Sequence, residues 1–140
     1  MKLKIKQLSQ SAKYPYKAHE TDAGFDIFTA EEVTLIKGKT YTISTGIAMA
    51  IPDGYYGELK ARSSIDAKTP LRIATGTIDS SYRGEVKIIT ELKYGDTYTV
   101  EKGAKIAQLI LHKVPVVEIE VMDELDETDR GTGGFGSTGK

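Results

Sequence analysis

YTISTGIAMAI, residues 41–51, shows the pattern that decides the fold, because its large apolar side chains fall on alternate positions. The odd positions from Tyr41 to Ile51 are mostly large and apolar, whereas the even positions are small or polar. Successive side chains of a β-strand point to opposite faces. This period of two therefore predicts a strand with one face buried and the other turned outward or against a tight neighbour.

Other stretches repeat this alternation, and turn-forming residues separate them. Apolar side chains alternate with polar or outward positions at Val86, Ile88, Thr90 and Leu92, and again at Val117, Ile119 and Val121. Turn chemistry occurs at residues 37–38, 52–54, 94–96 and 102–103. Many short strands between frequent turns predict an all-β sandwich or barrel. Only residues 63–68 favour a short helical turn, which a hydroxyl side chain could cap.

Length and composition narrow the class of protein. The 140 residues fit one domain, and 39% hydrophobic residues are enough for a core. The 19 basic and 20 acidic residues nearly cancel, which argues against binding to nucleic acid through a basic face. Because the chain has no cysteine, a disulfide framework is excluded, and we expect His19 and His112 to be ordinary surface or edge residues. No apolar run suits a signal peptide or a membrane span, so we expect a soluble, cytoplasmic protein.

The end of the chain differs from the rest in composition. Residues 123–129 are mostly acidic and predict a solvated linker, while residues 130–140 contain five glycines and one aromatic side chain, Phe135. We therefore divide the chain into a core domain, residues 1–122, and a linker with a glycine-rich, flexible C-terminal arm, residues 123–140. The simplest interpretation of such an arm is terminal disorder.

Five local clusters carry groups that suit nucleotide chemistry: DAGFDI (22–27), ARSSIDAK (61–68), GTIDSSYRGE (76–85), GAKIAQLI (103–110) and RGTGGFGSTG (130–139). Arg62 offers a planar fork of donors, and the serines after it can hold further phosphate oxygens. Asp79 could accept a proton from water, and Tyr82 could pack flat against a sugar or base. Each cluster alone also fits a purely structural role, such as a capped turn, a polar loop or a buried amide with a backbone partner.

In this order along the chain, the five clusters resemble the five motifs of the trimeric dUTPase family, from Asp22 to Gly139. The resemblance implies a jelly-roll-like β fold and a homotrimer whose active sites are shared, with the arm of one subunit closing over a neighbour. It also implies hydrolysis of dUTP to dUMP and pyrophosphate, which limits uracil incorporation into DNA and supplies dUMP for dTMP synthesis. Mg²⁺ is the implied cofactor, held mainly by triphosphate oxygens and water.

Site residues follow from the resemblance, motif by motif. Asp79 resembles the catalytic aspartate that activates water for in-line attack on the α-phosphorus. Tyr82 resembles the tyrosine beneath the deoxyribose. A hairpin formed by Ala74, Thr75, Gly76, Thr77 and Ile78 resembles the element that reads uracil. The implied contacts to phosphates and catalytic water are Arg62, Ser63, Ser64 and Gln108. From the arm, the implied contacts are Arg130, Phe135, Gly136, Ser137 and Thr138. Asp26 is implied as an outer-shell neighbour of the metal.

The chain departs from the family pattern at three places. Ala61 stands where proline is common, Lys105 where arginine is common, and Ser64 where glycine is common. The first two positions have no catalytic role in this prediction, so they affect local rigidity more than activity.

Two alternative functions fit the same features. A dCTP deaminase of similar fold shares an Arg-Ser-Ser-like motif, but the glycine-rich arm argues against it. The other alternative is a regulatory role, in which the chain binds a protein partner as some dUTPases of mobile elements do.

Overall fold

The computed structural model describes residues 1–137 and 139. Over this range the chain forms ten strands and one short helix. In chain order they are β1 (Lys4–Gln7), β2 (Gly24–Phe28), β3 (Val33–Ile36), β4 (Tyr41–Ala50), β5 (Tyr55–Ala61), α1 (Ser63–Lys68), β6 (Leu71–Ile73), β7 (Gly76–Ile78), β8 (Glu85–Leu92), β9 (Thr97–Val100) and β10 (Lys105–Lys113).

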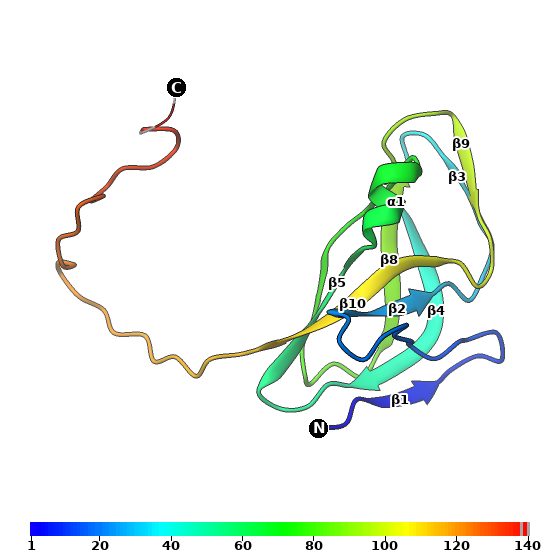
Figure 1. Cartoon of the computed structure of the whole chain (residues 1–140), viewed down its shortest axis with the longest axis horizontal. Coiled ribbons are helices and arrows are strands. Elements are labelled where there is room, and N and C mark those ends of the chain that lie inside the picture. The colour runs from blue at the N-terminus through cyan, green and yellow to red at the C-terminus, as the bar shows by residue number, and fades with distance from the viewer. Residues whose placement is uncertain (138, 140) are drawn as a thin grey trace.

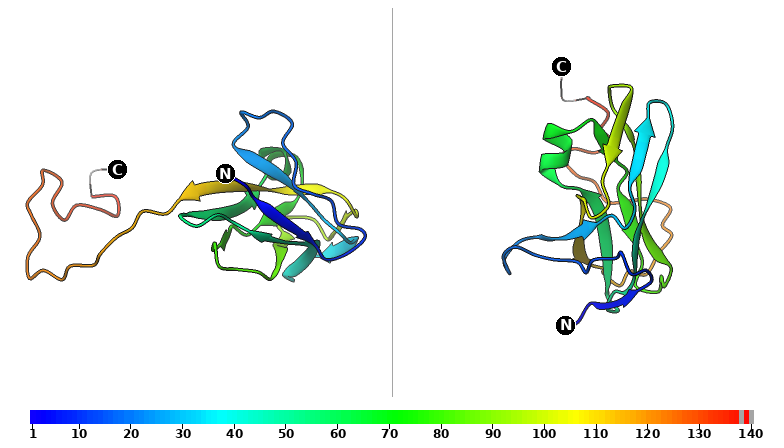
Figure 2. Two further views of the ribbon diagram at one scale, coloured as in Figure 1. Left: turned by 90° about the horizontal axis from the view of Figure 1, so that it is seen from below. Right: turned by 90° about the vertical axis from the view of Figure 1, so that its right-hand side faces the viewer.

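The strands form two four-stranded antiparallel sheets and one separate pair (Figure 1). The first sheet has the order β1-β4-β8-β6, the second has the order β2-β10-β5-β7, and β3 pairs with β9. Helix α1 lies at the same end of the molecule as β3 and β9, as both Figures 1 and 2 show. The predicted all-β, jelly-roll-like fold is confirmed.

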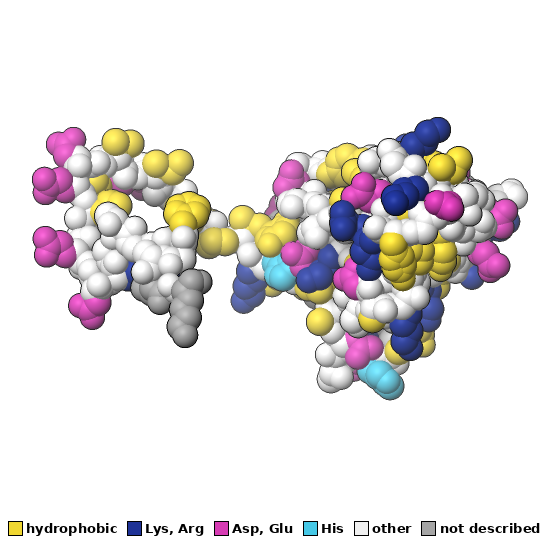
Figure 3. Space-filling model, turned by 90° about the horizontal axis from the view of Figure 1, so that it is seen from above, with side chains coloured by type: hydrophobic (Ala, Val, Ile, Leu, Met, Phe, Trp, Pro, Cys, Tyr) yellow, Lys and Arg dark blue, Asp and Glu magenta, His cyan; other side chains and the backbone are white. Residues whose placement is uncertain are grey.

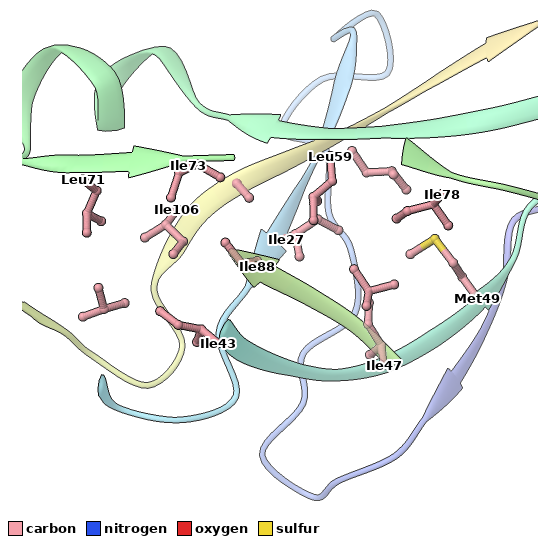
Figure 4. Packing of buried hydrophobic residues seen from close by; sticks show 14 of the residues in the cluster. Ile27, Ile43, Ile47, Met49, Leu59, Leu71, Ile73, Ile78, Ile88 and Ile106 are labelled. Carbon is pink, nitrogen blue, oxygen red and sulfur yellow. The ribbon is translucent and has the colours of Figure 1, made fainter. Parts of the chain in front are cut away.

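The core lies between the two four-stranded sheets (Figure 4). Strand β4 supplies Ile43, Ile47 and Met49 from the predicted inward face, and β8 supplies Val86 and Ile88. The second sheet meets them with Ile27, Leu59, Ala107 and Leu109. The alternation in the sequence therefore identified the buried face of both long strands.

Three buried threonines keep their hydroxyls within the hydrogen-bond network. Thr29 Oγ1 donates to the carbonyl of Glu101 at 2.8 Å, Thr90 Oγ1 donates to that of Arg72 at 2.9 Å, and Thr45 Oγ1 donates to that of Val86. Each partner is distant in sequence. Because a buried hydroxyl without a partner is costly, these bonds tie separate parts of the chain together.

Gly46 interrupts β4 with a bulge. Its φ of 71° lies in the left-handed region, and the register between β4 and β8 shifts between Ser44 and Ala48. The backbone N–H of Gly46 donates to Oε2 of Glu85 at 2.9 Å, and its carbonyl accepts from the N–H of Leu8 at 2.7 Å. A Cβ at this position would lie 2.8 Å from that of Ala12. Glycine is therefore required by both backbone conformation and space.

The structure corrects two local expectations. Helix α1 has the predicted bounds, but its N-cap is Arg62 and no side chain caps its N-terminus, so the expected hydroxyl N-cap is wrong. The alternation at residues 117–121 predicts a strand, yet the last strand of the described chain ends at Lys113, and Val117, Ile119 and Val121 are exposed. Within the described residues this segment joins neither sheet. The boundary between residues 122 and 123 stays a prediction.

We expect Ile88→Ala to lower the free energy of unfolding by about 2–5 kcal/mol, because it leaves a cavity between the sheets. Ile88 is completely buried, whereas its neighbour Ile89 is 47% exposed. Ile89→Ala is thus the matched control and should cost far less. Urea unfolding of both variants at one protein concentration measures the difference, and equal losses would contradict this account of the core.

Candidate active site

Two cavities contain most of the predicted site residues, and they share no lining residue. The first has a volume of about 260 Å³ and is lined by Thr42, Leu59, Gly76, Thr77, Ile78, Asp79, Tyr82, Glu85, Val86, Lys87 and Ile89. The second has a volume of about 390 Å³ and is lined by Asp22, Ala23, Gly24, Asp26, Arg62, Ser63, Ser64 and Gln108. Within one chain, the third sequence cluster is therefore separated from the first, second and fourth.

The first cavity, which we call the Asp79 cavity, lies where the chain crosses from one sheet to the other. Strand β6 pairs with β8 in the first sheet, and β7 pairs with β5 in the second. The predicted hairpin over residues 74–78 is thus wrong: β6 and β7 join different sheets, with Ala74 and Thr75 between them. Ala74 and Thr75 do not line this cavity, and Ala74 instead lines a smaller one of about 160 Å³ beside Arg72.

The turn after β7 holds Asp79 and Tyr82 beside each other. The N–H of Tyr82 donates to the carbonyl of Asp79 at 3.1 Å, and the Tyr82 hydroxyl donates to the carbonyl of Glu85 at 2.9 Å. The ring packs against Gly84, where a Cβ would collide with it. Tyr82 is thereby held at its backbone N–H and at its hydroxyl, while 46% of the residue stays exposed. Asp79 is also exposed, so its carboxylate can meet water and ligand.

Several residues of the Asp79 cavity were missed by the sequence prediction, among them Thr42, Lys87 and Ile89. All three occupy outward positions of β4 and β8, to which the sequence pattern assigns no role in the site. Ile89 gave no usable signal, because single apolar side chains are common at outward positions of a protein surface.

The second cavity, which we call the Arg62 cavity, brings three clusters together on the outer side of the second sheet. Register places Gln108 of β10 opposite Asp26 of β2 on one side and Lys60 of β5 on the other. Arg62 follows β5 directly, and Ser63 and Ser64 begin α1. Arginine, hydroxyl and amide donors thus face one space, as recognition of a phosphate chain requires.

Ion pairs hold the charged residues of the Arg62 cavity. Arg62 Nε lies 3.0 Å from Asp26 Oδ1, and Lys105 Nζ lies 3.8 Å from Asp26 Oδ2. The guanidinium also donates through Nη1 to the backbone carbonyl of Lys105 at 3.1 Å. Asp26, predicted as an outer-shell neighbour of a metal, is here the partner of two cations.

Gln108 owes its position to the absence of a side chain at Gly24. Its Nε2 donates to the carbonyl of Ala61 at 3.1 Å, so the amide links β10 to the end of β5. A Cβ on Gly24 would lie 3.2 Å from both Cβ and Cδ of Gln108 and closer still to Oε1. The glycine of the first cluster therefore makes room for the glutamine of the fourth.

The described arm residues do not reach either cavity. Arg130 folds back and donates through Nε to the carbonyl of Gly133 at 2.8 Å, and Phe135 is fully exposed with a φ of 52°. Gly136 and Ser137 are exposed as well. Figures 1 and 3 show the arm extending away from the sheets at the end of a narrow segment. Thr138 lies outside the described residues.

Comparison with known proteins identifies the family. The family model for dUTPase matches residues 10–139, which include both cavities and the arm. The chain belongs to the dUTPase family. A deoxyuridine 5'-triphosphate nucleotidohydrolase of Clostridium acetobutylicum is 44% identical over 139 residues, covering 98% of this chain and 96% of that protein. One from Paramecium bursaria Chlorella virus 1 is 41% identical and covers 98% and 97% of the two chains.

Solved dUTPase structures share the fold closely. A mutant dUTPase of Staphylococcus bacteriophage 80alpha, solved with dUpNHpp, superposes with a TM-score of 0.94 at 34% identity over 99% of each chain. A mutant dUTPase from phage phi11 of S. aureus, described as revealing the coordination of a structural Mg(II) ion, gives a TM-score of 0.85 at 33% identity and covers 89% of this chain and 98% of that one. The predicted membership of the dUTPase family is thus confirmed.

No helix within residues 1–137 and 139 is long and apolar enough to cross a membrane.

We expect Gly24→Ala to displace the Gln108 amide and lower kcat/KM for dUTP without unfolding the protein. If the clash is the cause, Gly24→Ala should cost much less in a Gln108→Ala background, where the amide is absent. Steady-state kinetics on the four proteins of this double-mutant cycle measure the coupling. Additive losses would show that Gly24 acts independently of Gln108.

Proposed function

We propose that the protein hydrolyses dUTP to dUMP and pyrophosphate in a homotrimer, at sites that combine the Asp79 cavity of one subunit with the Arg62 cavity of another. The observation that carries this proposal is the separation of the two cavities within one chain. The first offers a carboxylate, an aromatic face and an apolar floor, but few donors for phosphates. The second offers arginine, serine and glutamine donors, but no aromatic or apolar surface on which a nucleobase could pack.

The Asp79 cavity suits the deoxynucleoside. Strand β7 is the last strand of its sheet, so one edge of Gly76–Ile78 has no strand partner and its N–H and C=O groups can pair with a uracil edge as a neighbouring strand would. The fixed ring of Tyr82 can pack beneath the deoxyribose, where a 2′-hydroxyl would collide or lose its water. Ala74 and Thr75, which lie outside this cavity, contribute at most from the rim.

The Arg62 cavity suits the triphosphate. Phosphoryl transfer depends mainly on positioning and on neutralising charge. Arg62 and Ser63 would bind the bridging and β-phosphate oxygens, with Ser64 beside them, and Gln108 would contact a phosphate or the attacking water. Asp79, entering from the neighbouring subunit, would orient that water in line with the α-phosphorus and accept its proton.

Magnesium fits this site on the substrate more readily than in a protein cage. Within the described residues no three His, Asp or Glu side chains gather to hold a metal. The carboxylates of the Arg62 cavity already have donors: Asp26 pairs with Arg62, and Asp22 Oδ2 accepts from the N–H of His19 at 3.0 Å. We therefore assign the ion to triphosphate oxygens and water, with Asp26 in its outer shell at most. Bound there, it would neutralise phosphate charge.

The segment after β10 supports assembly. Its exposed side chains include Val116, Val117, Ile119, Val121 and Met122, a long apolar surface for a monomer to leave in water. Strand β1 is one of the two edge strands of the first sheet, and its outward Lys4 and Lys6 could face Glu118 and Glu120 of another chain. Addition of this segment to a neighbour's sheet would bury the apolar positions and carry the arm to another subunit.

Deamination and protein binding are the alternatives. The relatives named above are nucleotidohydrolases, and the family model includes the arm that argued against a deaminase. Pyrophosphate release from dUTP, with dCTP and UTP as controls, distinguishes hydrolysis from ammonia release. Phage dUTPases, among them that of Staphylococcus bacteriophage 80alpha, are described as controlling transfer of virulence genes. For this chain a regulatory partner stays a prediction.

Mixing two inactive variants tests the shared site. Asp79→Asn should lower kcat by roughly 10²–10⁴ through loss of the general base, and Arg62→Ala should weaken phosphate binding and turnover. A co-refolded equal mixture should regain about a quarter of wild-type activity, since random cyclic trimers leave one site in three intact in three-quarters of assemblies.

The matched control pairs Asp79→Asn with Tyr82→Ala. Both residues lie in the Asp79 cavity of one chain, so no mixed trimer contains an intact site and activity should not return. Differently tagged copies verify that subunits mix. Confirmed mixing without recovery in the Asp79/Arg62 pair would refute the shared site.

Removing residues 130–140 should abolish most activity while leaving assembly and thermal stability nearly unchanged. The described arm residues make no contact with the core, whereas Arg130 and Phe135 would bind phosphate and uracil after closure. Phe135→Ala should cost less than the truncation, because base stacking contributes only about 1–3 kcal/mol. Light scattering, thermal melts and dUTP turnover measure these effects. Full activity of the truncated protein would show that the arm is dispensable.

A further inference from the structure

The segment between β1 and β2 projects from the sheets and presents two lysines around two exposed tyrosines (Figure 2). Its residues 13–17 read Lys-Tyr-Pro-Tyr-Lys, and we call them the KYPYK loop. Tyr14 is 62% exposed and Tyr16 is 55% exposed. Aromatic side chains are enriched where proteins bind one another, so this loop is a candidate interaction surface.

Both lysines of the loop lie over aromatic rings. Lys13 Nζ is 5.5 Å from the centroid of the Phe28 ring, and Lys17 Nζ is 4.5 Å from that of Phe25. Within residues 1–137 and 139, neither ammonium forms an ion pair with a carboxylate. A ring face attracts a cation without neutralising it. The two positive charges are therefore held in place and stay available to a carboxylate from outside.

The KYPYK loop adjoins the Arg62 cavity. The backbones of Tyr16 and Asp26 exchange two hydrogen bonds, at 2.6 and 3.2 Å, as in an antiparallel pair. Directly opposed residues of such a pair point to the same face. Tyr16 therefore emerges on the face where Asp26 lines the cavity, beside the cavity without lining it. A segment bound to the loop would lie at the rim of the Arg62 cavity.

The acidic segment before the arm has the complementary pattern. Residues 123–127 read Asp-Glu-Leu-Asp-Glu, with two carboxylates on each side of Leu125. Leu125 is 86% exposed, and none of the ion pairs in the described part of the chain involves these carboxylates. Negative charges around an apolar centre match the KYPYK loop, in which a lysine stands on each side of the tyrosines.

Chain order brings the two segments together in an assembly. The acidic segment follows residues 114–122, which would join a neighbour's β1, and the KYPYK loop follows β1 itself. The acidic segment also precedes Arg130, which would reach a phosphate. Residues 123–129 can span at most about 25 Å. A chain held both at β1 and at the Arg62 cavity of one neighbour would therefore pass close to the KYPYK loop of that neighbour.

We propose that the KYPYK loop of one subunit binds residues 123–127 of a neighbouring subunit and thereby holds the arm of that neighbour beside the Arg62 cavity. The tyrosines pack on Leu125, and the lysines pair with the carboxylates on either side. The inference rests on the proposed shared site, to which it adds a docking contact outside the substrate-binding groups. An arm docked in this way has a high effective concentration at the site, which offsets part of the ordering cost of its glycines.

Disulfide trapping tests the contact directly, because the chain has no cysteine of its own. Full-length protein carrying Tyr16→Cys and Leu125→Cys should form covalently linked subunits on mild oxidation, since the two side chains meet in the proposed contact. The readout is the size of the oxidised chains on a denaturing, non-reducing gel. Linkage that is absent, or confined within single chains, would overturn the proposal.

Tyr94 provides the matched control for trapping. It is 53% exposed, close to the value for Tyr16, but it lies in the turn between β8 and β9, at the opposite end of the sheets from β1 (Figure 1). Tyr94→Cys combined with Leu125→Cys should leave the subunits unlinked. Equal linkage of both pairs would show that the arm collides with any exposed position, and the proposal would fall.

Charge reversal measures what docking contributes to catalysis. Lys13→Glu combined with Lys17→Glu should lower kcat/KM for dUTP roughly three- to tenfold, as expected for two exposed ion pairs. Adding Asp123→Lys and Asp126→Lys should restore it, and salt should narrow the gap between the double variant and wild type. If the combined variant recovers nothing, the lysines do not act through the acidic segment and the docking is wrong.

Lys37→Glu combined with Lys39→Glu is the control for net charge. Both lysines are exposed in the turn between β3 and β4, and their reversal should leave kcat/KM unchanged. An equal loss in this control would reveal a general repulsion of the anionic substrate, which would overturn the interpretation of the KYPYK loop.

The mixture of Asp79→Asn and Arg62→Ala subunits separates failure of this inference from failure of the proposed function. If that mixture regains activity but the cysteines at positions 16 and 125 do not link subunits, only the docking contact is wrong. If the subunits link but the mixture regains no activity, the docking stands and the shared site falls.

Discussion

Packing of the two four-stranded sheets against each other takes up the inward face of every long strand. The side chains that fill this space are almost all aliphatic, and the buried threonines are bonded to distant carbonyls. A core of this kind has no place for a charged nucleotide. Chemistry is confined to outward faces, free sheet edges and the turns between strands, and both cavities occupy such places.

Small residues determine how the outward groups are held. Gly24 makes room for Gln108, Gly84 for the ring of Tyr82, and Gly46 for the bulge that brings its N–H to Glu85. In each case the missing Cβ lets a polar or aromatic side chain settle against backbone. The site is thus prepared before substrate arrives, which lowers the ordering cost of binding.

The sequence predicted what local physics controls. Alternation on β4 and β8 identified the buried face because burial follows the strand period, and the bounds of α1 were correct. The crossing between β6 and β7 was missed, since a short polar turn between two apolar runs looks the same whether the runs pair with each other or with different sheets. Lys87 and Ile89 were missed because an outward position on a strand says nothing of what approaches it. The pairing of Asp26 with Arg62 and Lys105 joins three distant segments, so no local pattern could reveal it.

Residues 114–122 show how the sequence can specify a structure that one chain cannot form. Their alternation has the period of a strand, yet within the described residues they belong to no strand. The N–H of Val114 donates to the carbonyl of Gly54 at 2.8 Å, and the valine, isoleucine and methionine side chains beyond it are left in water (Figure 3). Such a conflict between pattern and structure is unfavourable in a foldable sequence unless a partner resolves it. A neighbour's free β1 edge would resolve it, because it offers unpaired backbone groups and lysines at every second position. The same pairing would fix where each arm begins relative to a neighbouring site. Assembly and catalysis would then depend on one segment, and dilution that dissociates the proposed trimer would remove shared sites and arm closure together.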